Sequence, residues 1–259
     1  MVDRRIAGAG RTQAHRPSPV FLGLVALWAT GGAMAWLDFG NRTVNVLLFV
    51  LAGWVVSLSL HEYAHARYAY HSGDRAVADR GYLTLNPLKY THPVLSIALP
   101  VLFLLLGGIG LPGGAVWVDR RAVRGRLNAS LISGVGPAAN VLFLGLLLIP
   151  FAMNVRTREH TTFWAAVALL AFLQLTAALL NLVPIPGVDG GNIVRPWLSP
   201  GAGRVFDQIA PFGMLILFAL LFTPITGEVF FVVVRSISDV IGLPRGLAQL
   251  GLDMIQFWK

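Results

Sequence analysis

The chain has 259 residues, of which 56% are hydrophobic and only 12% carry a charge, and its mean hydropathy is +0.69. These values exclude an ordinary soluble globular domain and are typical of a membrane protein with several spans. The net charge of +8 does not indicate nucleic-acid binding, because the arginines lie between apolar runs, as the positive-inside rule describes. The absence of cysteine excludes disulfides and thiolate metal ligands.

The N-terminal region combines a basic tail with a first apolar run. Residues 1–19 contain four arginines and are expected to form a cytoplasmic tail. The charge-free run 17–37 is long enough to cross a bilayer. Together with Ala33-Met34-Ala35 it also imitates a signal peptide, but its length favours an uncleaved first helix. We expect the membrane-embedded domain to cover residues 20–223 and a membrane-associated segment to follow at 224–259.

The second predicted span runs from Val44 to His65 and could continue to His71. Its charge-free part ends in the pattern His61-Glu62-Tyr63-Ala64-His65. Four residues advance a helix by about 400°, so His61 and His65 share one face and could bind a single Zn²⁺. Glu62 points to a neighbouring face, where its carboxylate could take a proton from a water molecule at the metal. Such a short pattern also arises by chance, but ionisable groups beside a membrane-length apolar run usually mark function.

The next stretch interrupts the pattern of simple spans. Residues 79–92 resemble a surface strand and turn. Residues 93–118 are charge-free but broken by glycines and prolines, and four arginines follow within 120–126. A full crossing would place those arginines outside, so we predict a re-entrant helix that returns as an extended strand at 113–118. Further spans are predicted at 127–155, 161–183 and 208–223.

The sequence thus predicts an α-helical polytopic membrane protein with five to six transmembrane helices and a re-entrant helix/β-strand segment. Under this topology 14 Lys and Arg residues lie inside and 3 outside, with 3 C-terminal ones unassigned. The orientation places the two histidines toward the cytoplasmic side of the plasma membrane. Beyond Glu228, residues 229–234 either begin another span or form an interfacial helix. Residues 245–259 are amphipathic.

A catalytic zinc site usually has a third protein ligand. His71 is close in sequence, but Tyr68 stands where a turn-forming glycine would be needed to bring it back to the metal. Asp189 is the better candidate, because it adjoins an apolar span on the same predicted side, after Pro184 and Pro186. An aspartate before Gly190-Gly191 could also serve only as a turn or helix cap.

Three sequence motifs, which follow one another along the chain, resemble those of the site-2 protease family of intramembrane zinc metalloproteases. They are His61-Glu-Tyr-Ala-His65, Gly136-Pro-Ala-Ala-Asn140 and Asn181-Leu-Val-Pro-Ile-Pro-Gly-Val-Asp189-Gly-Gly, which fall within residues 44–192. The resemblance implies one Zn²⁺ per chain bound by His61, His65 and Asp189, with Glu62 as general base. It also implies a role for Asn140 in handling substrate or the oxyanion, although a hydrogen bond between helices is equally compatible with that residue.

The resemblance implies hydrolysis of peptide bonds in or near the transmembrane segment of single-span substrates, such as a membrane-tethered regulator. The strand Gly114-Ala115-Val116 could clamp an unwound substrate by strand addition. No PDZ or CBS module is expected. Two other functions remain open: a metal or solute transporter using the same cluster, and an inactive protease-like scaffold. The sequence shows no repeated halves of the kind common in transporters, and the intact motif disfavours a scaffold.

Overall fold

The computed structural model describes residues 16–90 and 116–256 of the chain. These residues form helices joined by turns, with no β-strand among them. Five helical segments are long and apolar enough to cross a membrane. This confirms the predicted fold class, an α-helical polytopic membrane protein. Most of the predicted tail at 1–19 and most of the predicted re-entrant segment at 93–118 lie outside the described residues.

The first two long helices are α2 (Pro19–Trp36) and α3 (Arg42–Ser72). Each begins with a polar cap: the Ser18 hydroxyl accepts a hydrogen bond from Phe21 N, and the Asn41 side chain accepts one from Val44 N. α3 confirms the predicted second span and is longer than predicted. Its 31 residues correspond to about 46 Å, which exceeds the roughly 30 Å of a hydrocarbon core. One end of α3 therefore extends beyond the apolar layer.

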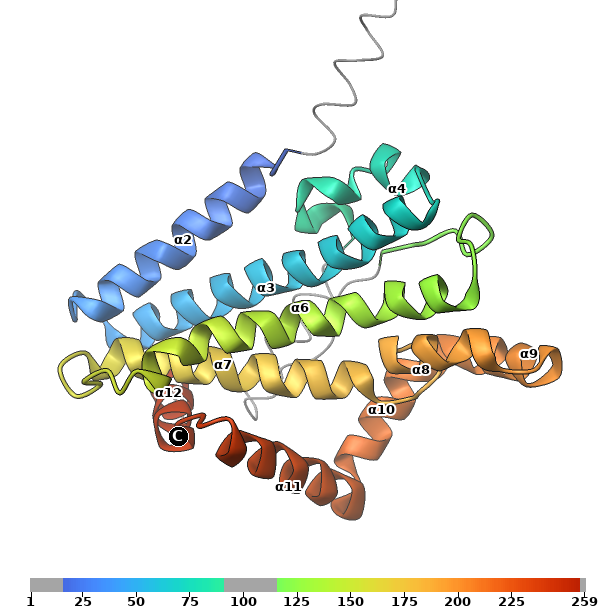
Figure 1. The fold of residues 1–259 in the computed structure, drawn as a ribbon. Coiled ribbons are helices and arrows are strands. Elements are labelled where there is room, and N and C mark those ends of the chain that lie inside the picture. Colours follow the sequence, from blue (N-terminus) through green and yellow to red (C-terminus); the bar gives the residue numbers. More distant parts are fainter. Residues whose placement is uncertain (1–15, 91–115, 257–259) are drawn as a thin grey trace, which may run out of the picture.

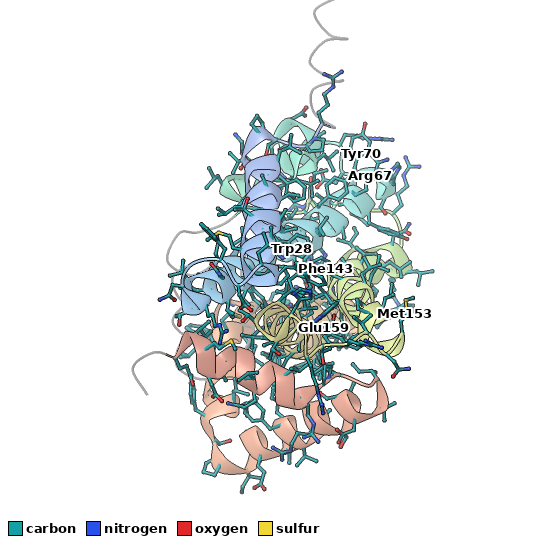
Figure 2. The ribbon with its side chains drawn as sticks, turned by 90° about the vertical axis from the view of Figure 1, so that its left-hand side faces the viewer. Trp28, Arg67, Tyr70, Phe143, Met153 and Glu159 are labelled. Atoms are coloured by element: carbon teal, nitrogen blue, oxygen red, sulfur yellow. The ribbon has the colours of Figure 1, made fainter. Side chains whose placement is uncertain are left out.

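The next two long helices, α6 (Arg126–Ala152) and α7 (Thr161–Leu182), match the spans predicted at 127–155 and 161–183. The helices α2, α3, α6 and α7 run antiparallel to their neighbours along the chain (Figure 1). α7 lies at the centre, in contact with α2, α3, α6 and α12. Aromatic side chains pack between the helices of the bundle. Trp28 of α2 contacts Phe143 of α6, with ring centroids 5.5 Å apart (Figure 2). The polar site described below is thus embedded in an apolar core.

The segment after α3 differs from the prediction. In place of a strand and turn at 79–92, the chain forms α4 (Ala76–Asp79) and two short 3-10 helices, η1 (Tyr82–Thr84) and η2 (Pro87–Lys89). Leu83 and Tyr90 are buried there, and the Tyr90 hydroxyl donates to Ser59 O of α3. Burial of these side chains against α3 is a tertiary effect that the local strand-like pattern does not reveal.

The chain after α7 bends repeatedly. α8 (Asp189–Val194) and η4 (Arg195–Trp197) lead into α9 (Pro200–Ile209), η5 (Ala210–Phe212) and α10 (Gly213–Phe222). The span predicted at 208–223 falls largely within Pro200–Phe222, which is long and apolar enough to cross a membrane, but this segment is interrupted by η5. Pro211 lies in the break, and proline removes a backbone donor from a helix. α10 turns away from the bundle (Figure 1).

The C-terminal part consists of α11 (Pro224–Val240) and α12 (Arg245–Ile255). α12 was predicted as an amphipathic segment at the membrane surface. Its apolar face instead packs on α7, and Ala248, Gly251 and Ile255 are buried there. A Cβ at Gly251 would lie 3.0 Å from the Ala165 carbonyl carbon, so the glycine allows the two helices to approach closely.

Candidate metal centre

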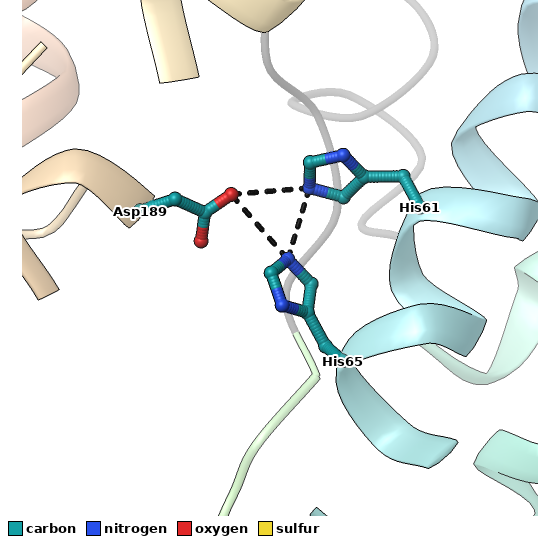
Figure 3. Close-up of side chains that lie close together, drawn as sticks. All are labelled: His61, His65 and Asp189. Atoms are coloured by element: carbon teal, nitrogen blue, oxygen red, sulfur yellow. Dashed lines mark hydrogen bonds and ion pairs between the residues drawn. The ribbon is translucent and has the colours of Figure 1, made fainter. Parts of the chain in front are cut away.

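Three potential metal ligands converge where α3 meets α8. His61 and His65 lie one turn apart on α3, and both are buried. Their Nε2 atoms are 3.0 Å apart, and Asp189 Oδ2 lies 3.1 Å from the first and 3.3 Å from the second (Figure 3). In the described part of the chain these residues form the only group of three or more His, Cys, Asp or Glu that could hold a metal ion.

The chain around Asp189 fixes its position through close backbone packing. α7 ends at Leu182, and a turn that contains two prolines leads to Asp189 as the first residue of α8. Asp189 thus begins a short helix after this turn. A Cβ at Gly190 would overlap the Leu182 carbonyl, and one at Gly191 would overlap the Ile185 carbonyl oxygen. Both glycines are therefore required for this approach of α8 to the end of α7.

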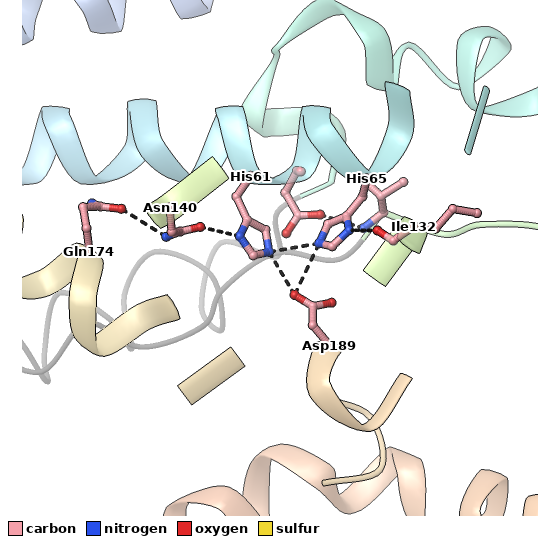
Figure 4. Close-up of polar contacts among 8 residues, drawn as sticks. His61, His65, Ile132, Asn140, Gln174 and Asp189 are labelled. Atoms are coloured by element: carbon pink, nitrogen blue, oxygen red, sulfur yellow. Dashed lines mark hydrogen bonds and ion pairs between the residues drawn. The ribbon is translucent and has the colours of Figure 1, made fainter. Parts of the chain in front are cut away.

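The Nδ1 atoms of the two imidazoles, which lie on the ring side away from Asp189, also have partners. Nδ1 of His61 lies 2.5 Å from Asn140 Oδ1, and Nδ1 of His65 lies 2.5 Å from the Ile132 carbonyl oxygen (Figure 4). Both partners are oxygen acceptors, so both Nδ1 atoms act as N–H donors. Each Nε2 atom then presents its lone pair to the space shared with Asp189, as in zinc sites where an outer partner orients the ligand histidine.

The donor set fits a tetrahedral zinc ion. Ligand bonds of about 2.0–2.1 Å place tetrahedral ligand atoms about 3.3–3.4 Å apart, close to the 3.0 Å, 3.1 Å and 3.3 Å that separate the three candidate ligand atoms. Gly136 of α6 faces the same point. A Cβ there would overlap His65 Nε2 and lie 2.7 Å from His61 Nε2, so only glycine leaves this space open. One further position remains for a water or substrate in a site with three protein ligands.

Asp189 is suited to binding a cation. Burial alone would raise the pKa of its carboxyl, but in the metal-free site protonated imidazoles of His65 and His61 lower that pKa below its ordinary value, and a bound cation would take the place of those protons. The group is therefore a carboxylate at neutral pH.

Glu62 directly follows the candidate ligand His61 in the sequence but has a different partner. Its side chain is buried, and its Oε2 accepts a hydrogen bond from the backbone N–H of Val116 over 3.0 Å. Val116 is the described end of the predicted clamping strand. Gly114 and Ala115 lie outside the described residues, and residues 116–118 form no strand pairing with the described part of the chain. The clamp stays a prediction.

Asn140 has a position that the sequence did not specify. Its Oδ1 faces His61, and its Nδ2 donates to Gln174 Oε1 over 3.0 Å. Its side-chain amide therefore makes hydrogen bonds between helices, which was one of the two predicted roles; an oxyanion role stays a prediction.

His71 is exposed in the last turn of α3 and is not part of the metal group.

The sequence did not predict that Gly136 leaves the space opposite the two imidazoles open for a metal. It also did not predict the hydrogen bonds that Ile132 makes with His65 and Gln174 makes with Asn140. Gly136 is the first residue of the Gly-Pro-x-x-Asn motif, and that motif was the available signal. Gln174 offered another, because it is a lone amide in the middle of an apolar span. Ile132 offered none, because only its backbone carbonyl takes part.

The fold and the site together define a multi-pass membrane protein with a His-Glu-x-x-His metal centre. The chain is 45% identical to a protein of Mycolicibacterium smegmatis over 251 residues, which cover 95% of this chain and 96% of the relative. A second relative, from Mycobacterium tuberculosis, is 45% identical over 256 residues, or 96% of this chain and 97% of its own. Both carry the provisional name zinc metalloprotease Rip2.

A Bacillus subtilis protein with the provisional name zinc metalloprotease YwhC is 28% identical over 205 residues, which cover 76% of this chain and 91% of that protein. No family model and no solved structure matches the chain. The 45% identity to the Rip2 proteins, over nearly the full length of the chain, shows that the chain belongs to the site-2 protease family of zinc metalloproteases. Zinc is therefore the metal that the family implies for this centre.

Proposed function

We propose that the protein is an intramembrane protease that holds one zinc ion per chain and cuts peptide bonds in or near the transmembrane segment of membrane-tethered substrates. One observation carries this proposal: His61, Glu62 and His65 are buried on a membrane-length helix, and Asp189 meets them from a second element. His61 lies 19 residues after the start of α3, which corresponds to about 28 Å along the helix. The arginine distribution assigns that end of α3 to the cytoplasmic side.

The residues divide the chemistry between them. A zinc ion held by His61, His65 and Asp189 would polarise the scissile carbonyl and activate water as a nucleophile near neutral pH. Glu62 takes the proton of that water and delivers it to the leaving amine. The Val116 N–H fixes the Glu62 carboxylate through one of its oxygens. The surrounding apolar core limits access of bulk water to the site.

The substrates that suit this arrangement are single-span membrane proteins, such as a membrane-tethered regulator in the plasma membrane. A transmembrane helix hides its backbone carbonyls in its own hydrogen bonds, so it must unwind locally before attack. The segment that ends at Val116 is the candidate surface for holding the unwound chain by strand addition.

The deciding experiment compares wild type with Glu62→Gln in reconstituted membranes. Cleavage of candidate single-span substrates and zinc content are measured for both proteins. We expect Glu62→Gln to retain zinc near one per chain and to lose cleavage, because the amide cannot act as a base. Equal cleavage by both proteins would contradict the mechanism. Zinc binding without cleavage by either protein, combined with transmembrane metal flux, would support a transporter instead.

A further inference from the structure

The candidate ligand His61 is the end of a chain of hydrogen bonds that crosses three helices. Gln174 of α7 is completely buried, and its Oε1 accepts hydrogen bonds from Ser57 Oγ over 2.5 Å and from Asn140 Nδ2 over 3.0 Å. Asn140 Oδ1 in turn lies 2.5 Å from His61 Nδ1. Figure 4 shows Gln174, Asn140 and His61 in this order. α3, α6 and α7 are thereby linked to the metal centre through polar atoms.

The direction of each bond in this chain follows from the chemistry of the amide groups. The carbonyl oxygen of Gln174 can only accept, so the NH₂ end of Asn140 must face it. The oxygen end of Asn140 must then face His61, whose Nδ1 must carry the hydrogen. Only this arrangement leaves the Nε2 lone pair of His61 free for a metal. If the Gln174 amide were reversed, its NH₂ group would face the NH₂ group of Asn140, and Asn140 would no longer be held in this orientation.

Fold stability alone does not account for the amide at position 174. Within the described part of the chain, the Gln174 Nε2 atom is buried and has no hydrogen-bond partner. A buried donor without a partner destabilises the folded state. An apolar side chain of similar size would remove that penalty but would leave the Asn140 Nδ2 donor without its acceptor. The useful part of Gln174 is therefore its carbonyl oxygen, and that oxygen points toward the site.

We propose that Gln174 is a positioning residue of the metal centre: its carbonyl oxygen, held by Ser57, orients Asn140 and through it the zinc-binding ring of His61. The inference rests on the proposed zinc ligands but not on the identity or location of the substrate. It assigns Gln174 and Ser57 to the site although neither reaches the metal. It also predicts that metal binding depends on the acceptor at position 174 even in variants that retain the fold.

The test compares variants of the full-length protein purified with zinc. Gln174→Met removes the acceptor, and Gln174→Glu keeps a carbonyl oxygen at the same place. Ser57→Ala removes one donor to Gln174, and Ser59→Ala is the matched control. Ser59 is buried two residues away on α3, and within the described residues its hydroxyl donates to the Val55 carbonyl of its own helix. The rate of zinc release to a chelator is measured for each, with the melting temperature of the metal-free form.

We expect Gln174→Met to release zinc about tenfold faster than wild type, at the lower end of the effect of an outer partner of a zinc-binding histidine. Its metal-free form should remain folded at the temperature of the release measurement, so that the faster release does not result from unfolding. Gln174→Glu should restore slow release, and Ser57→Ala should accelerate release by about two- to threefold while Ser59→Ala does not. The visible spectrum of the cobalt-substituted Gln174→Met protein should also shift, because the ligand field reports the orientation of His61.

Unchanged zinc release and an unchanged cobalt spectrum in Gln174→Met would overturn the inference. If Gln174→Met does not accumulate as folded protein, Ser57→Ala decides, and release equal to that of Ser59→Ala would overturn it. Absence of zinc from the wild type would contradict the proposed function and this inference together. Zinc in the wild type with equal release from every variant would contradict the inference alone.

Discussion

The backbone N–H of Val116 donates a hydrogen bond to the Glu62 carboxylate over 3.0 Å. Val116 is the first described residue of a segment that is fixed at two further points. Arg80 Nη1 donates to the Trp117 carbonyl oxygen over 3.1 Å, and Asp119 N donates to Asp74 Oδ2 over 2.8 Å. The segment therefore lies at a defined position beside the predicted general base, and its backbone contributes to the site directly.

Replacing Val116 with proline tests this contact, because proline has no backbone N–H. A hydrogen bond to a charged group contributes about 1.5–3 kcal/mol, so we expect cleavage to fall by about tenfold to a hundredfold while zinc content is unchanged. Val116→Ala keeps the N–H and should retain most of the activity. Cleavage of a bound substrate by Val116→Pro at the wild-type rate would rule out both the positioning role and the clamping strand.

Gly136→Ala should abolish zinc binding without unfolding the protein. The added methyl group would overlap His65 Nε2 and lie 2.7 Å from His61 Nε2, in the space that the ion needs. Gly134→Ala is the matched control on the same helix, because its methyl group would meet only Ile193 Cδ1 at 3.9 Å. Zinc content measured after purification should fall at least about tenfold in the first variant and stay near wild type in the second. Equal zinc content in the two variants would contradict the placement of the metal.

Asp74→Ala should destabilise the region that supports Val116. The Asp74 side chain is 1% exposed and accepts hydrogen bonds from two backbone N–H groups, those of Ala76 and Asp119. Each donor left without a partner costs about 1–3 kcal/mol. We expect a lower melting temperature and faster amide exchange at residues 116–119, followed by reduced cleavage. A variant with wild-type exchange at Asp119 would show that this anchor is dispensable.

The proposed orientation can be tested with single cysteines, because the chain contains none of its own. Arg121→Cys should react with a membrane-impermeant maleimide only from the cytoplasmic side, and Arg158→Cys only from the outside. Both arginines lie in loops outside the long helices. Labelling of both positions from the same side would contradict the topology and the cytoplasmic placement of the metal centre.

The four long helices and the histidine pair were predictable because they depend on local features of the chain. Apolar length alone identifies α3, α6 and α7, since a span needs about 20 apolar residues whatever its neighbours are. The spacing of His61 and His65 fixes their common face through helix geometry alone. Asp189 was a candidate for the same reason, as a carboxylate beside a span.

The remaining features depend on contacts between distant residues. α12 packs on α7 because the two helices fit at Gly251, and its amphipathic pattern is equally compatible with a lipid surface. The bend before α10 requires Gly213, where a Cβ would overlap the Pro186 carbonyl oxygen. The partner of Asn140 required knowing that Gln174 faces it from α7. Periodicity and spacing do not contain this information.

The metal ligands come from two places separated by nearly half of the chain, with α3 on one side and α8 on the other. A bound ion therefore acts as a cross-link that closes a very large loop in a protein without disulfides. Because α8 also packs on α6 and α7, loss of the ion would lower the free energy of unfolding of the whole bundle rather than detach α8 alone.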